Sequence, residues 1–257
     1  MKHGIRATLT AVVGIGLSLG LAAAATAQAA APAPAPAQKQ GGEKTVEEAY
    51  LQESAEAVMV KELSQSEDKD SKEIALDYAL KAIDNGRKSD DLRNSLEYLA
   101  LENTDVVVRS AGLGVATNNY PDIRRRACEY LGEFPSVEAK DTLVKVIGNN
   151  KTEDPMVLAE AIRSLGKIGM NDDDEVVHAI CNSVVHFSNV GMSEDRLAVY
   201  TLFAFTDLAD KHKGIKDMAA VTDTIIQFTK GSYVSAVKKL AMQTLEKLAQ
   251  YAVANSN

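Results

Sequence analysis

The chain has 257 residues and a formal net charge of −8, with 46% hydrophobic and 25% charged residues. This composition is typical of a globular protein with a sizeable core and excludes an intrinsically disordered one. Aromatic residues make up only 5% and Trp is absent, which argues against stacking platforms for single-stranded nucleic acid. The acidic balance argues against a general phosphate-binding surface, because such a surface needs clustered Lys and Arg. We therefore expect no nucleic-acid partner.

Residues 1–29 have the layout of a bacterial-type secretory signal peptide. The basic residues Lys2 and Arg6 precede an apolar stretch over about 11–25, and Ala27-Gln28-Ala29 supplies small residues for cleavage. The stretch is shorter than the roughly 20 residues that span a bilayer, although no charge interrupts it. We expect a periplasmic or secreted protein that does not insert into a membrane after cleavage. The alternative is a tether to the inner membrane through an uncleaved signal.

Residues 30–44 are rich in Ala and Pro, which predicts an extended, semi-rigid spacer. A proline-rich recognition ligand is the alternative, but nothing basic or aromatic accompanies the prolines. The expected domain organisation is a signal peptide over 1–29, a linker over 30–44 and a helical domain over 45–257.

From residue 45 onward, apolar residues recur at spacings of three and four, which predicts an all-α body. Ser89, Asp154 and the prolines at 121 and 155 mark helix starts, and Gly169 marks a helix end. The predicted helices cover residues 45–64, 71–85, 90–102, 104–117, 121–133, 136–148, 154–168, 173–188, 194–212, 215–229 and 233–253.

An internal repeat with a shift of 34 residues is the most informative feature of the sequence. Residues 123–132 align with residues 157–166, so that Ala127 matches Ala161 and Gly132 matches Gly166. Weaker copies are centred on Ala204 and Ala241. A small central residue lets neighbouring helices approach within roughly 8–10 Å. A two-helix unit cannot bury its apolar face alone, so several units must stack.

This pattern resembles HEAT repeats, including the HEAT-like repeats of the phycobilisome-lyase type, whose second helix reads V-R-x-x-A-x-x-x-L-G after an Asp turn. Residues 122–132 match that pattern well, and residues 154–166 match it except that Leu158 replaces the Arg. The resemblance implies a right-handed α-solenoid of about five helical hairpins, although armadillo or another α-solenoid type is also open. The hairpins would span residues 70–102, 104–133, 136–169, 172–212 and 214–253, with the helix over 45–64 as an N-terminal cap whose outer face stays wet.

The sequence offers little catalytic or metal-binding chemistry. His178 and His186 are eight residues apart, too far for a metal pair on one helical face. The acidic run at 172–175 lacks the spacing of an EF-hand, so helix capping is favoured over calcium binding. We expect no catalytic residue, no metal site and no cofactor. Cys128 and Cys181 would lie a whole repeat apart, so we expect no disulfide between them.

The clustered basic residues point to one candidate surface. Proteins with HEAT-like repeats commonly bind on the inner face formed by their second helices, so the resemblance implies a docking face for a protein or peptide there. The residues predicted to be exposed on this face are Arg125, Glu129, Arg163 and Lys167, with Lys238 and Lys239 further along. Such a basic strip would favour an acidic segment in the partner. A solvated face with ion pairs between units is the alternative.

The leading functional hypothesis is a non-catalytic protein-interaction scaffold of the bacterial cell envelope. The alternative is a lyase-like or accessory enzyme, by analogy with phycobilin lyases that carry similar repeats, and this rests on fold analogy alone. The sequence leaves the partner and the oligomeric state open.

Overall fold

The structure, a computed structural model, describes residues 45–102, 119–149, 153–189 and 194–254. It divides the chain into two units, residues 1–43 and 44–257, and every described helix belongs to the second. The described residues form ten α-helices and one 3-10 turn and contain no strand, which confirms the all-α prediction. The helices are α1 (Val46–Ser64), α2 (Lys69–Asp84), α3 (Asp90–Leu101), α4 (Pro121–Leu131), α5 (Val137–Gly148), α6 (Pro155–Ile168), α7 (Glu175–Asn189), α8 (Asp195–His212), α9 (Met218–Lys230) and α10 (Ser235–Ala254).

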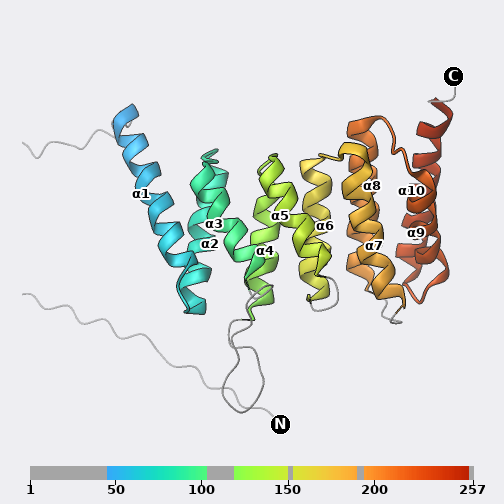
Figure 1. Cartoon of the computed structure of the whole chain (residues 1–257), viewed down its shortest axis with the longest axis horizontal. Coiled ribbons are helices and arrows are strands. Elements are labelled where there is room, and N and C mark those ends of the chain that lie inside the picture. The colour runs from blue at the N-terminus through green and yellow to red at the C-terminus, as the bar shows by residue number, and fades with distance from the viewer. Residues whose placement is uncertain (1–44, 103–118, 150–152, 190–193, 255–257) are drawn as a thin grey trace, which may run out of the picture. The chain divides into compact units, whose positions relative to one another are not determined.

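Successive helices alternate between two layers (Figure 1). The odd-numbered helices α1, α3, α5, α7 and α9 contact one another in that order, and the even-numbered helices α2 to α10 do the same. Each odd-numbered helix also packs on the even-numbered helix that follows it. Five hairpins in the described residues therefore stack into an α-solenoid, with α1 and α10 at the two ends of the row.

The division into hairpins differs from the prediction at the N-terminal end. α1 packs extensively on α2 and α3 on α4, whereas α2 and α3 make few contacts with each other. The helix over 45–64 is therefore half of the first hairpin, and residues 70–102 are not a pair. Apolar spacing marks the buried face of a helix but does not say which neighbour covers it. The predicted helix over 104–117 lies outside the described residues.

The helix ends follow the local signals in the sequence. The Ser89 side chain accepts a hydrogen bond from the Leu92 N–H at 3.3 Å, and Asp154 accepts from the Met156 N–H at 2.8 Å. Pro155 begins α6, and Gly169 ends it with a left-handed φ of +72°. These caps set where α6 begins and ends, and α6 lies between α4 and α8.

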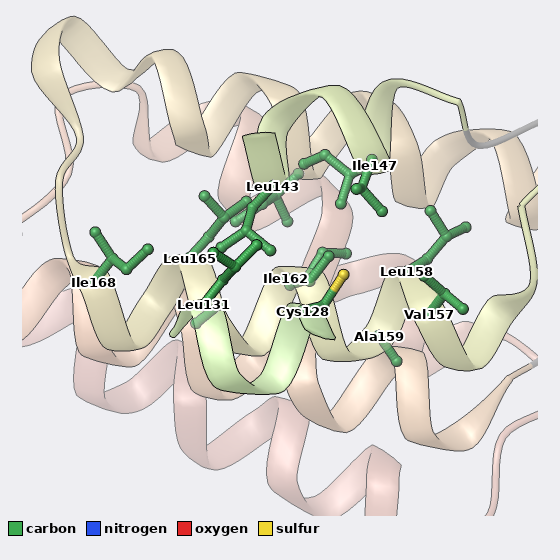
Figure 2. Close-up of a cluster of buried hydrophobic side chains, with 14 of the residues drawn as sticks. Cys128, Leu131, Leu143, Ile147, Val157, Leu158, Ala159, Ile162, Leu165 and Ile168 are labelled. Atoms are coloured by element: carbon green, nitrogen blue, oxygen red, sulfur yellow. The ribbon is translucent and has the colours of Figure 1, made fainter. Parts of the chain in front are cut away.

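The core lies between the two layers (Figure 2). Large apolar side chains of α4, α5 and α6 meet there, among them Leu131, Leu143 and Ile162, all fully buried. Each such side chain contributes about 1.5–3 kcal/mol relative to exposure. The central alanines of the repeats are also fully buried: Ala127, Ala161, Ala204 and Ala241. Small side chains at these positions let the even-numbered helices approach closely.

Both cysteines are free thiols in this core, Cys128 on α4 and Cys181 on α7.

None of the described helices combines the length and the hydropathy needed to cross a membrane.

Candidate interaction surface

Three of the predicted site residues come together where α4 packs on α6. Arg125 Nη1 lies 3.1 Å from Glu129 Oε2 on its own helix and 3.7 Å from Glu160 Oε2 on α6. Lys167 of α6 reaches back to Glu133, with 3.8 Å between Nζ and Oε1. The structure thus adds two carboxylates, Glu133 and Glu160, to the predicted set.

Arg163 points towards α8 instead. Its guanidinium pairs with the Asp207 carboxylate, and its Cζ atom lies 5.4 Å from the centre of the Phe203 ring. Phe203 is 39% exposed, which is unusual for a large aromatic side chain. Sequence reasoning missed it, although a signal exists. Phe203 directly precedes the central Ala204, and a helix whose buried face is centred on Ala204, Phe205 and Leu208 turns residue 203 outward.

Arg125 and Arg163 are less exposed than predicted. Their side chains are 29% and 26% exposed, because carboxylates of the neighbouring helices cover the guanidinium groups. Reversing Arg125 to an acid would place a third carboxylate beside Glu129 and Glu160. Charge reversal at Arg125 is therefore expected to destabilise the contact between α4 and α6.

The remaining predicted residues, Lys238 and Lys239, lie on α10, separated from α6 by α8. Lys239 is exposed and Lys238 half-buried, and neither forms an ion pair with a described residue. The structure therefore does not join them to the cluster on α4 and α6.

A row of alternating charge runs across the even-numbered layer. Each member lies six residues after the central alanine of its repeat: Glu133, Lys167, Asp210 and Lys247. Lys167 pairs with Glu133 across α4 and α6, and Lys247 Nζ lies 2.8 Å from Asp210 Oδ2 across α8 and α10. The alternative of ion pairing between units is thus what the structure shows for this row.

Two adjoining hollows lie along this row. One, of about 510 Å³ and open to solvent, is lined by Gly132, Glu133, Gly166, Lys167, Asp207, Asp210 and Lys211. The other, of about 310 Å³, extends to α2 and is lined by Leu80, Ile83, Asp84, Lys88, Glu129, Tyr130, Glu133 and Lys167. Glu133 and Lys167 border both hollows. We therefore describe the two hollows together as one open groove, which runs over α2, α4, α6 and α8.

Charge is divided unequally between the two layers. By sequence, the even-numbered helices hold 13 Lys and Arg residues against 11 Asp and Glu, whereas the odd-numbered helices hold 5 against 12. The negative charge of the helical body therefore resides mainly on the odd-numbered layer. The even-numbered layer, which carries the groove, is the more favourable side for an anionic partner.

Two carboxylates of the even-numbered helices, the buried Glu160 and the more exposed Asp210, have pKa values shifted in opposite directions. Burial is the main cause that raises the pKa of Glu160, and the nearby Glu129 carboxylate raises it further. The pKa of Asp210 is lowered, because Lys247 and the Tyr251 hydroxyl donate hydrogen bonds to its carboxylate. Burial thus disfavours the charged form of Glu160, whereas the charged form of Asp210 is favoured.

Arg124, the first of three consecutive arginines at 124–126, faces inward. Its Nη2 and Nε atoms lie 2.6 and 3.2 Å from the two carboxylate oxygens of Glu153, and both side chains are almost fully buried. This bidentate pair joins the start of α4 to the segment before α6, so Arg124 is structural.

The other candidate residues also have structural roles. His178 Nε2 lies 3.0 Å from Asp217 Oδ2, which links α7 to the start of α9. In the acidic run over 172–175, the buried Asp174 accepts hydrogen bonds from the Asp217 N–H and the Asn171 side-chain amide.

Within the described ranges, no three His, Cys, Asp or Glu side chains are placed to hold a metal ion. The His186 side chain lies outside the described part.

Comparison with known families agrees with this architecture. Residues 111–184 match the family of HEAT repeats, a stretch that includes α4, α5, α6 and most of α7. The match covers less than half of the chain, and it includes the alanine-centred helices from which the repeat was read. No curated protein matches the chain. This part of the protein is therefore similar to HEAT repeats, which commonly mediate protein interactions.

Proposed function

We propose that the protein is a non-catalytic scaffold that binds a protein or peptide partner along the groove of its even-numbered helices. The observation that carries the proposal is the division of charge between the layers, which leaves the grooved layer the less acidic side of an acidic protein. Stacked repeats present such continuous surfaces to extended partners. The exposed Phe203 beside Arg163 supplies an aromatic and cationic anchor, the type of residue that dominates interface energetics.

The partner proposed for this surface carries an acidic segment. Arg125 and Arg163 would bind such a segment by exchanging carboxylate partners. The signal-like sequence of residues 1–29 supports a location in the bacterial cell envelope, with the protein periplasmic or secreted. HEAT-like repeats of the phycobilisome-lyase type remain the finer family assignment proposed from the residue pattern.

The proposal is tested by capture from envelope extracts on the immobilised chain, comparing Phe203→Ala with a matched control, Val137→Ala. Val137 is 54% exposed on α5 of the opposite layer. We expect Phe203→Ala to reduce capture of a specific partner at least several-fold, with Val137→Ala behaving as wild type. Polyglutamate should compete with the partner. Equal capture by all variants would show that the partner does not use this face.

A further inference from the structure

The first helix carries an apolar stripe that no described residue covers. Leu51 is 67% exposed, Val58 60% and Met59 44%, and Ala55 is exposed between them. Leu51 and Val58 are seven residues apart and share one face of α1. Leu51 and the buried Val60 are nine residues apart, about two and a half turns, which puts them on opposite sides of the helix. The stripe therefore points away from α2 and α3.

This stripe is unusual for the end of a repeat stack. Terminal repeats normally present a polar outer surface, because no further repeat covers them. The sequence predicted such a wet face for residues 45–64. Glu47, Lys61 and Glu62 are exposed as predicted. However, Glu56 turns inward and pairs with Arg87 at 2.6 Å, and Leu51 and Val58 share the outward side.

The last helix has a smaller apolar patch on its open side. Met242 is 55% exposed and Ala249, seven residues later, is also exposed. Tyr251 contacts Asp210 of α8, and Met242 lies nine residues before it, on the side of α10 that faces away from α8. Lys238 and Lys239 lie four and three residues before Met242 and border the patch.

The two end helices carry opposite charge. α1 contains five Glu and one Lys, whereas α10 contains three Lys and one Glu. Exposed Glu62 borders Val58 on α1, as the lysines border Met242 on α10. Two α1 helices would repel each other, and α1 facing α10 would combine apolar contact with charge attraction.

We propose that the protein associates head to tail, with α1 of one copy docking on α10 of a second copy. The contact is heterologous, so it leaves a free α1 and a free α10 and can be repeated until a ring or a filament forms. Each contact covers both apolar patches. This association uses the ends of the row and leaves the groove of the even-numbered layer open.

The test is chemical crosslinking of full-length single-cysteine additions, Val58→Cys and Met242→Cys, with a short bifunctional maleimide. The native Cys128 and Cys181 are buried and do not compete. A mixture of the two variants should give several-fold more covalent dimer than either variant alone. Val137→Cys, exposed on α5 in the middle of the row, is the control for random encounters. Circular dichroism melts verify that each variant is folded.

Lys239→Glu in the Met242→Cys chain should lower the yield of mixed dimer several-fold, and so should added salt. Dimers formed by Val58→Cys alone would instead show an α1-to-α1 contact and overturn the head-to-tail arrangement. A mixed yield equal to that of the Val137→Cys control would overturn self-association altogether. In that case the stripe on α1 is covered by another partner or by residues outside the described part.

Discussion

Gly166 of α6 lies directly against the backbone of Ala204 on α8. A Cβ atom at position 166 would come within 2.7 Å of Ala204 Cα, closer than real Cβ contacts allow. A Cβ atom at position 132 would likewise come within 2.7 Å of α6, here of the Oγ atom of the Ser164 side chain. The glycine that ends the repeat pattern is thus a contact residue between successive even-numbered helices, and its absence of a side chain sets their spacing.

Gly166→Ala should therefore destabilise the protein. Overpacking against backbone that cannot move aside costs about 1–3 kcal/mol, and the better helix propensity of Ala returns at most about 1 kcal/mol. We expect a net loss of about 1–2 kcal/mol in the free energy of unfolding, measured by urea denaturation. Gly148→Ala is the matched control, since a Cβ there meets nothing within 4 Å. Equal stability of the two variants would contradict the close approach of α6 and α8.

Breaking the buried pair of Arg124 and Glu153 should be strongly destabilising. Glu153→Leu leaves a buried guanidinium without its carboxylate, which typically costs about 3–5 kcal/mol. The double variant Arg124→Met/Glu153→Leu removes both charges and should lose markedly less than the sum of the two single changes. A double-mutant cycle in urea measures this coupling. Strict additivity would mean that the two side chains do not meet in solution.

Glu160→Gln should stabilise the protein at neutral pH. The pKa of Glu160 is raised in the folded state by burial, so folding favours its protonated form. Wild-type stability therefore falls as the pH rises from the unfolded value of 4.5 through the folded pKa. The amide side chain of the variant does not titrate, so the variant lacks this pH dependence of stability. Arg125 keeps Glu129 as an ion-pair partner in the variant. Melting temperatures should show a gain for Glu160→Gln at pH 7 that shrinks towards pH 4.

Asp210→Asn should behave in the opposite way. The pKa of Asp210 is lowered by hydrogen bonds from Lys247 and Tyr251. The ionised Asp210 therefore stabilises the folded protein at pH values above its pKa in the unfolded chain, 3.8. This stabilisation is lost as the pH falls through the lower pKa of the folded state. The variant should melt below wild type at pH 7, and the difference should vanish in acid. A deficit that persists unchanged at low pH would point to lost packing rather than lost charge.

The two thiols should be unreactive in the folded protein. Cys128 is fully buried, and burial raises the pKa of both thiols, which lowers the thiolate fraction. Labelling by a maleimide should proceed at the rate of unfolding, whereas Val137→Cys should label at once. Mass spectrometry should find no bridge between Cys128 and Cys181. Rapid labelling of Cys128 would place α4 in a different rotation from the one described.

Local features of this protein could be predicted from its sequence because they depend on neighbouring residues alone. The spacing of apolar residues marked the helices, Ser89 and Asp154 marked helix starts, and the alanines at 127 and 161 marked the helix contacts. A period of 3.6 residues determines which side of a helix is buried wherever that helix lies. The HEAT-like stacking of units follows from the repeat for the same reason.

Contacts between helices were decided only by the tertiary structure. The sequence grouped Arg125 and Arg163 in one basic strip, but it could not show that Asp207 and Glu160 cover them. It placed Arg124 beside Arg125 without showing that Arg124 forms a buried ion pair with Glu153. These pairs join residues 29 to 44 positions apart, and whether they meet depends on how each helix is rotated and shifted against its neighbour. Side-chain packing across the whole stack sets that rotation, and no local pattern encodes it.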